Sequence, residues 1–129
     1  MPNVEIEIRR QYPLDQEERI IDAVHSAVVE GLKIPVEDKT IRLEVHEPHR
    51  FPVSQSKTDR YTLINIDLLA GRSLAAKKTL YRAIVRNLEP LGIPPDQVKI
   101  PLRESPSDDW AIRGGLPASD VDLDFEVNV

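Results

Sequence analysis

The sequence has no cysteine among its 129 residues and only five glycines. Without cysteine there is no disulfide framework, no thiolate nucleophile and no cysteine-based metal site. No block of Lys or Arg occurs, and the formal net charge of −5 argues against a dedicated nucleic-acid binder. No apolar run is long enough to cross a bilayer, and the N-terminus lacks the order of a secretory signal. We therefore expect a single cytoplasmic domain over residues 1–129 that binds neither nucleic acid nor membrane.

The first half of the chain has the apolar spacing of a strand, a helix and a second strand. The segments NVEIEIRR and TIRLEVHE alternate at period two, which is typical of half-buried strands. Between them, residues 13–35 place apolar side chains on one stripe, which predicts an amphipathic helix of about four or five turns. This first unit covers about residues 2–47.

The same order returns after a polar, turn-rich connection at residues 48–60. YTLINIDLL predicts a strand, SLAAKKTLYRAIVRNLEPLGIP a helix, and VKIPLRE a further strand in which Pro101 indicates an edge or a bulge. The two helices end in similar segments, LKIPVED and LGIPPDQ. We interpret residues 2–47 and 61–104 as copies of one β-α-β unit, although two unrelated units of this pattern would also look alike.

Two β-α-β units restrict the possible folds. Each unit makes its own two strands parallel, with a right-handed crossover. If a pseudo-twofold axis relates the units, they form one four-stranded mixed sheet with both helices on one face, an α/β (α+β) fold. The other face of the sheet then needs a cover, which indicates an oligomer.

The remaining residues, 105–129, add a turn and a clear strand pattern. The RGG at positions 113–115 predicts a hairpin turn, and VDLDFEVNV alternates over its whole length. We expect a final strand that pairs with a sheet edge of its own chain or of a neighbouring subunit.

Three residues with useful chemistry converge at one edge of this predicted sheet. Pro2 starts the first strand, Asp38 precedes the second, and Arg72 follows the first strand of the antiparallel second unit. If Met1 is removed, Pro2 carries a secondary amine. An α-amino group has a pKa of about 7.7–8.0; a neighbouring guanidinium lowers this pKa and favours a general base, whereas a carboxylate raises it and favours a general acid. Arg72 can hold a substrate carboxylate through two hydrogen bonds.

Each of these residues also has a purely structural explanation. Proline suits the first position of a strand, and aspartate is frequent in turns. Arg72 could be a solvated residue ahead of its helix, but positive charge is slightly unfavourable at a helix N-terminus, which favours a role in a site.

Two long segments resemble a known family. INIDLLAGRSLAAKK through VKIPLRESPSDDWAIRGGLPAS is similar to the 4-oxalocrotonate tautomerase pattern of a strand, Gly-Arg-Ser, a helix, a strand, and an aromatic residue before a Gly-rich hairpin. MPNVEIEIRR through GLKIPVED resembles the N-terminal unit of double-length members of the tautomerase superfamily, especially the malonate semialdehyde decarboxylase group. The likeness covers most of the chain except residues 48–60, and it implies the tautomerase/MIF-like fold.

The resemblance implies a role for five residues. Pro2 would be the catalytic amine after removal of the initiator methionine, and Asp38 would be its carboxylate partner. Arg72 would bind and polarise the carboxylate or carbonyl of a small substrate. Trp110 would form the aromatic wall of the pocket, with Ile112 beside it.

The chain departs from the decarboxylase pattern at one position. That group carries a second arginine where this chain has Ala70. We therefore expect a keto–enol tautomerase acting on a small 2-oxo acid such as phenylpyruvate. A decarboxylase or hydratase, or a non-catalytic oligomeric binding protein, are the alternatives. The resemblance also implies a homotrimer, with one site per chain because Thr62 stands where the second repeat would need a proline.

The sequence predicts no cofactor and no metal site. His46 and His49 lie near Glu44 and Glu47 in sequence, but these residues do not have a recognised metal-ligand spacing.

Overall fold

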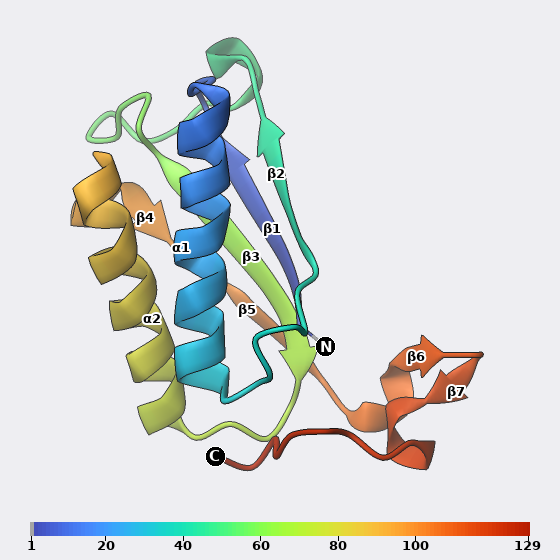
Figure 1. Ribbon diagram of the computed structural model, residues 1–129. Coiled ribbons are helices and arrows are strands. Elements are labelled where there is room, and N and C mark those ends of the chain that lie inside the picture. Colours follow the sequence, from blue (N-terminus) through green and yellow to red (C-terminus); the bar gives the residue numbers. More distant parts are fainter. Residues whose placement is uncertain (1) are drawn as a thin grey trace.

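The computed structural model describes residues 2–129, so Met1, whose removal the amine hypothesis requires, lies outside the described residues. The main sheet has the order β2 (Ile41–Val45), β1 (Asn3–Ile8), β3 (Thr62–Leu69), with β4 (Val98–Lys99) and β5 (Leu102–Ser105) both beside β3. β1 is parallel to β2 and antiparallel to β3, whereas β3 is parallel to β4 and β5. The sheet is mixed, and the two β-α-β units run in opposite directions, as the sequence predicted (Figure 1).

Two helices, α1 (Leu14–Leu32) and α2 (Leu74–Leu88), pack side by side on one face of the sheet (Figure 1). Their apolar stripes face the alternating apolar residues of β1 and β3, and this is the core of the protein. The most deeply buried side chains come from both repeats and include Ile6, Ile20, Ile64, Leu80 and Ile84. The predicted α+β architecture, with both helices on one face, is confirmed.

The last strand position of the sheet is divided in two. The sequence predicts one strand over VKIPLRE, and the structure has β4 and β5 with a break at Ile100 and Pro101. Pro101 has no N–H for the ladder, but its carbonyl accepts the N–H of Ile66 at 3.2 Å. Both pieces of this strand therefore stay aligned with β3. The strand lies at the edge of the sheet, where a proline is tolerated.

The C-terminal part forms a hairpin away from the sheet, followed by an extended segment (Figure 1). The predicted turn lies between β6 (Ala111–Arg113) and β7 (Leu116–Pro117). Residues 121–129 pair with no strand within residues 2–129, so the expected pairing with an edge of the same chain is wrong, whereas pairing with a neighbouring subunit stays a prediction. Its apolar residues are half-buried and its polar residues exposed, so the alternation reflects packing on one side without a ladder.

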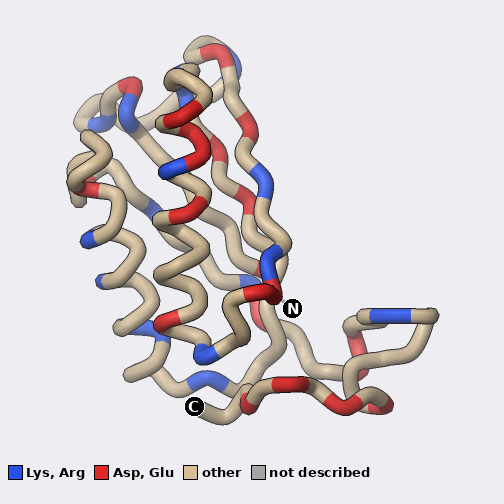
Figure 2. Tube along the Cα trace, viewed as in Figure 1, with Lys and Arg blue, Asp and Glu red and all other residues tan. Residues whose placement is uncertain are grey.

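Four carboxylates belong to exposed residues at alternate positions from 120 to 126, near the end of the chain (Figure 2). They belong to Asp120, Asp122, Asp124 and Glu126. We refer to residues 121–129 as the C-terminal segment.

Among residues 2–129, no helix combines the length and the hydrophobicity needed to cross a membrane. The cytoplasmic location expected from the sequence stays a prediction.

Gly31 sets the distance between the two helices. A Cβ atom at this position would lie 2.6 Å from Cβ and 2.7 Å from Cα of Leu80 on α2. We expect Gly31→Ala to lower the free energy of unfolding by about 1–3 kcal/mol, because the helices must move apart to admit the methyl group. Urea denaturation measures the change. Ser26→Ala, at an exposed position of α1, is the control and should leave stability nearly unchanged; equal stability of both variants would contradict the close approach of the helices.

Candidate active site

The start of β1, the turn before β2 and the loop after β3 meet at one edge of the sheet (Figure 1). β1 begins where β2 begins, because they are parallel, and where β3 ends, because that pair is antiparallel. Asn3, next to Pro2, is paired with Asp67 near the end of β3. This edge therefore holds Pro2, the turn that contains Asp38 and the loop that contains Arg72.

Pro2 is buried directly ahead of β1. Its counterpart in the second repeat is Thr62, which is fully buried and donates its hydroxyl to the Arg60 carbonyl at 3.0 Å. A threonine inside the chain offers no amine. Of the two repeat starts, only the first can therefore supply an amine base.

Asp38 lies in the turn between α1 and β2, where its N–H donates to the Pro35 carbonyl at 3.1 Å. The residue is half-buried and borders a pocket of about 360 Å³. The β6–β7 hairpin contributes Ile112 and Arg113 to this pocket, and the C-terminal segment contributes Phe125. The pocket thus has an apolar wall and ionisable groups at its border.

Carboxylates outnumber guanidinium groups around this pocket. Glu37, Asp38 and Asp124 border it, whereas Arg113 is the guanidinium group among its lining residues. Arg113 donates to the Asp122 carbonyl at 3.2 Å. An anionic substrate would need a further positive charge close by to bind here.

Arg72 carries such a charge; it does not line this pocket but lies next to Phe125, which does. It is 6% exposed, and its Nη2 donates to the Leu32 carbonyl at the C-terminus of α1 at 3.0 Å. Nη1 lies 3.5 Å from the Leu69 carbonyl, and the buried Nε has no hydrogen-bond partner among the described residues. Burial lowers the pKa of Arg72, while the carboxylates of Glu104 and Glu126 act in the opposite direction. Among residues 2–129, the guanidinium is held by carbonyl oxygens and by no directly bonded carboxylate, so its charge is not neutralised by a direct ion pair.

Phe125 connects Arg72 to the pocket. Its ring centroid lies 5.5 Å from Cζ of Arg72, within the range of a cation–π contact. The same ring borders the pocket that contains Asp38. The C-terminal segment is held over the loop by one backbone hydrogen bond, from the Ser73 N–H to the Val129 carbonyl at 2.9 Å.

The structure separates Trp110 from Ile112. Trp110 donates its Nε1–H to Ser105 Oγ at 2.5 Å and borders a shallow depression with Asn3 and Asp67. Ile112 borders the pocket of Asp38. The two were expected side by side as one wall, but Trp110 precedes β6 and its ring is held by Ser105, so Trp110 and Ile112 border different surfaces. Their roles in substrate binding stay predictions.

Sequence reasoning missed Phe125 and Arg113 as residues of this region. Both lie within patterns that the sequence did show, the alternation of VDLDFEVNV and the RGG turn. Alternation identified Phe125 as an inward-facing residue. It could not identify the Arg72 guanidinium as its contact, because the two are far apart in sequence.

Comparison with known proteins points to a single group of enzymes. Residues 38–113 match the family model of the tautomerase enzymes. The probable tautomerase YusQ of Bacillus subtilis (strain 168) is 25% identical over 121 residues, which cover 89% of this chain and 95% of YusQ.

Solved structures agree with this match. FG41 malonate semialdehyde decarboxylase, inhibited by 3-bromopropiolate, has a TM-score of 0.78 at 28% identity, with coverage of 84% of this chain and 86% of that chain. The R7 fused 4-OT asymmetric trimer has a TM-score of 0.82 at 19% identity and covers 91% and 96% of the two chains. At that lower identity the likeness concerns the fold alone.

Gly71 allows the C-terminal segment to close over the Arg72 loop. Its φ is +143°, and a Cβ atom here would lie 2.9 Å from the Val127 carbonyl oxygen. We expect Gly71→Ala to displace the segment and to raise the hydrogen-exchange rate of the Ser73 amide by about tenfold or more, because its bond to Val129 is lost. The measurement is amide exchange followed by NMR.

Gly114→Ala is the matched control for this prediction. Gly114 also has a positive φ, +59°, but lies in the β6–β7 turn with no atom near an added Cβ. The control variant should leave the Ser73 amide protected. Unchanged protection in Gly71→Ala would contradict the proposed closure.

Proposed function

The chain belongs to the tautomerase enzyme family, and from this premise we propose that it catalyses keto–enol tautomerisation of a small 2-oxo acid such as phenylpyruvate. The Pro2 amine, free once Met1 is removed, takes the proton of the enol hydroxyl and returns a proton to the neighbouring carbon. The C–O bond of the enol becomes a C=O double bond while its C=C bond becomes a single bond, and no atom is gained or lost. Proton transfer of this kind is general acid–base catalysis.

The observation that carries this proposal is the meeting of three segments at one sheet edge. Pro2 at the start of β1, Asp38 in the turn before β2 and Arg72 in the loop after β3 come from distant parts of the chain. A pocket borders Asp38 at this edge. An amine, a carboxylate and a guanidinium are the groups that a proton transfer on a carboxylate substrate uses.

In this mechanism Arg72 binds the substrate carboxylate and Asp38 orients the amine. Because Arg72 is 6% exposed below Phe125, the substrate reaches the guanidinium when the ring turns aside. Because water is largely excluded from this buried guanidinium, its attraction to a carboxylate is stronger than in bulk water. Phe125 and Ile112, which border the same pocket, would then supply apolar surface for the rest of the substrate, and Trp110 would contact it only from the neighbouring depression.

A decarboxylase or hydratase is the second candidate, favoured by the 28% identity to FG41 malonate semialdehyde decarboxylase. Carboxylates around the pocket would favour a protonated Pro2, which is the form that such an enzyme uses as a general acid. Ala70 argues against it, because the loop then carries one arginine. Titration of the Pro2 amine separates the two: a pKa well below that of an ordinary α-amine supports the tautomerase, and a pKa at or above it supports the alternative.

We expect Pro2→Ala to lower kcat/KM for the phenylpyruvate enol by about 10²–10⁴-fold, because the secondary amine is replaced by a primary amine of different basicity and position. Intact-mass measurement first establishes that Met1 is absent from both proteins. Thr62→Ser, at the equivalent position of the second repeat, is the control and should keep full activity. Undiminished turnover by Pro2→Ala would rule out the mechanism.

We further propose that the protein assembles as a homotrimer. Fused 4-OT of the same fold forms trimers. Large apolar side chains are exposed near the candidate site, with Val36 67% and Leu74 64% exposed, and a subunit contact would bury them. Light scattering after gel filtration should give three times the chain mass of 14.6 kDa. A monomer mass at every concentration tested would contradict the trimer.

A further inference from the structure

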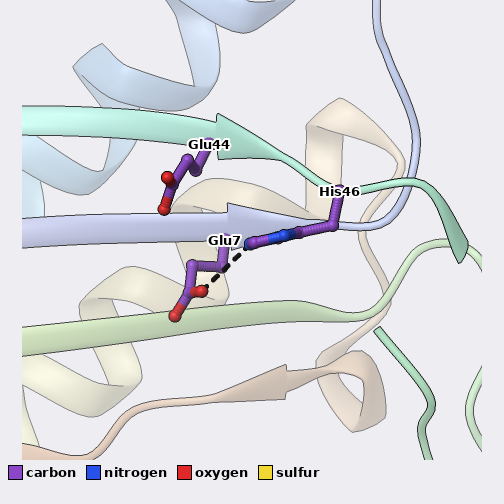
Figure 3. A group of neighbouring side chains, drawn as sticks. All are labelled: Glu7, Glu44 and His46. Atoms are coloured by element: carbon purple, nitrogen blue, oxygen red, sulfur yellow. Dashed lines mark hydrogen bonds and ion pairs between the residues drawn. The ribbon is translucent and has the colours of Figure 1, made fainter. Parts of the chain in front are cut away.

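Three side chains with metal-binding atoms meet on the face of the sheet that the helices leave open (Figure 3). Glu7 lies on β1, Glu44 lies on β2, and His46 follows β2 directly. One ligand atom of each residue lies within 4.8 Å of the other two. His46 Nε2 and Glu7 Oε1 are 3.0 Å apart.

The strand register brings two like charges together at this point. Glu5 is paired with Arg42, and an ion pair of 2.7 Å joins them. One step further along the same face, Glu7 is paired with Glu44. Two carboxylates directly opposite each other on neighbouring strands repel, and a cation between them removes that repulsion.

The distances suit a transition-metal ion of ordinary bond lengths. Zinc binds imidazole nitrogen at about 2.0–2.1 Å and carboxylate oxygen at about 2.0–2.2 Å, so two ligands of one tetrahedral ion lie roughly 3.3–3.6 Å apart. His46 Nε2 and Glu7 Oε1 are 3.0 Å apart, so a small outward shift of the two side chains admits the ion between them. Glu44 is exposed, and a rotamer change of its side chain brings its carboxylate into range.

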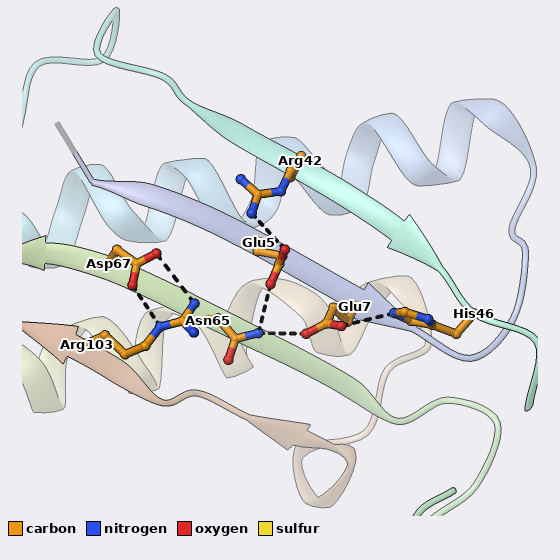
Figure 4. Close-up of polar contacts among 7 residues, drawn as sticks. All are labelled: Glu5, Glu7, Arg42, His46, Asn65, Asp67 and Arg103. Carbon is orange, nitrogen blue, oxygen red and sulfur yellow. Dashed lines mark hydrogen bonds and ion pairs between the residues drawn. The ribbon is translucent and has the colours of Figure 1, made fainter. Parts of the chain in front are cut away.

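Surrounding residues contact two of the three ligands, and Figure 4 shows one of these contacts, between Asn65 and Glu7. Asn65 on β3 donates to Glu7 Oε2 at 2.7 Å, which leaves Oε1 directed at His46. The ring of Phe51 packs edge-on against the His46 ring, with centroids 5.3 Å apart. A hydrogen bond to a ligating carboxylate, such as that from Asn65 to Glu7, is characteristic of metal sites, because it fixes the donor atom before the ion arrives.

We propose that Glu7, Glu44 and His46 bind one Zn²⁺ ion per chain, with water completing a tetrahedral set. The imidazole favours zinc over magnesium and calcium, which prefer oxygen ligands alone. Glu7 and His46 lie at the end of β1 and β2 remote from Pro2, so the ion ties the edge strand β2 to β1 and takes no part in the chemistry at Pro2.

Zinc titration of the tag-free protein tests the site. Calorimetry with ZnCl₂ should give one ion per chain, and Mg²⁺ at the same concentration should give no heat. The chain has three histidines, so NMR can follow each ring separately. Zinc should shift the ring signals of His46 and leave those of His25 and His49 in place. Shifts confined to His25 or His49, or no binding at micromolar zinc, would overturn the proposal.

Variants assign the ligands. His46→Gln and Glu44→Gln should each weaken zinc binding by about tenfold or more. His49→Gln and Glu47→Gln, close in sequence but outside the cluster, are the matched controls and should bind as the wild type does. Zinc should raise Tm in the wild type and not in His46→Gln, because an ion bound to the folded state stabilises it. Wild-type affinity in His46→Gln would refute the site, and none of these readouts depends on the tautomerase assay.

Discussion

The pairing of β1 with both of its neighbours determines the rest of the structure. Because β1 runs parallel to β2 and antiparallel to β3, its first residue lies beside the start of one strand and the end of the other. That single arrangement brings Pro2, Asp38 and Arg72 to one edge. Its register also places Glu7 opposite Glu44, so the candidate active site and the proposed zinc site are consequences of the same ladder at its two ends. A shift of one residue in the pairing of β1 would turn its inward side chains outward and would disrupt both the candidate active site and the proposed zinc site.

Arg72 shows how a buried charge can be stable without a paired carboxylate. The carbonyl of Leu32 at the end of α1 accepts from it, and the negative end of a helix dipole favours a cation at that place. Phe125 covers the guanidinium with its ring. These neutral partners hold the side chain in position while leaving its charge available, which a salt bridge would not do.

Most of the fold was predictable because its signals are local. Periodic apolar residues identified both helices and the strands, and Pro101 marked the interrupted edge. The C-terminal segment alternates without a strand partner within residues 2–129, because alternation reports half-burial, whereas a strand also needs a neighbour to pair with. The separation of Trp110 from Ile112 was visible only in the structure, since the hairpin stands away from the sheet. The Glu7–His46 contact spans 39 positions along the chain, a distance at which no spacing rule for metal ligands applies.

The carboxylates of the C-terminal segment also affect whether the protein can aggregate by adding strands. An extended stretch with apolar residues on one side and unpaired backbone groups is a template for adding further strands, and so for aggregation. Here every second residue from Asp120 to Glu126 is acidic. Two copies of the segment laid against each other in register would bring these charges together, and the repulsion would keep such copies apart. The acidic side of the segment thus disfavours aggregation through pairing with its own copy.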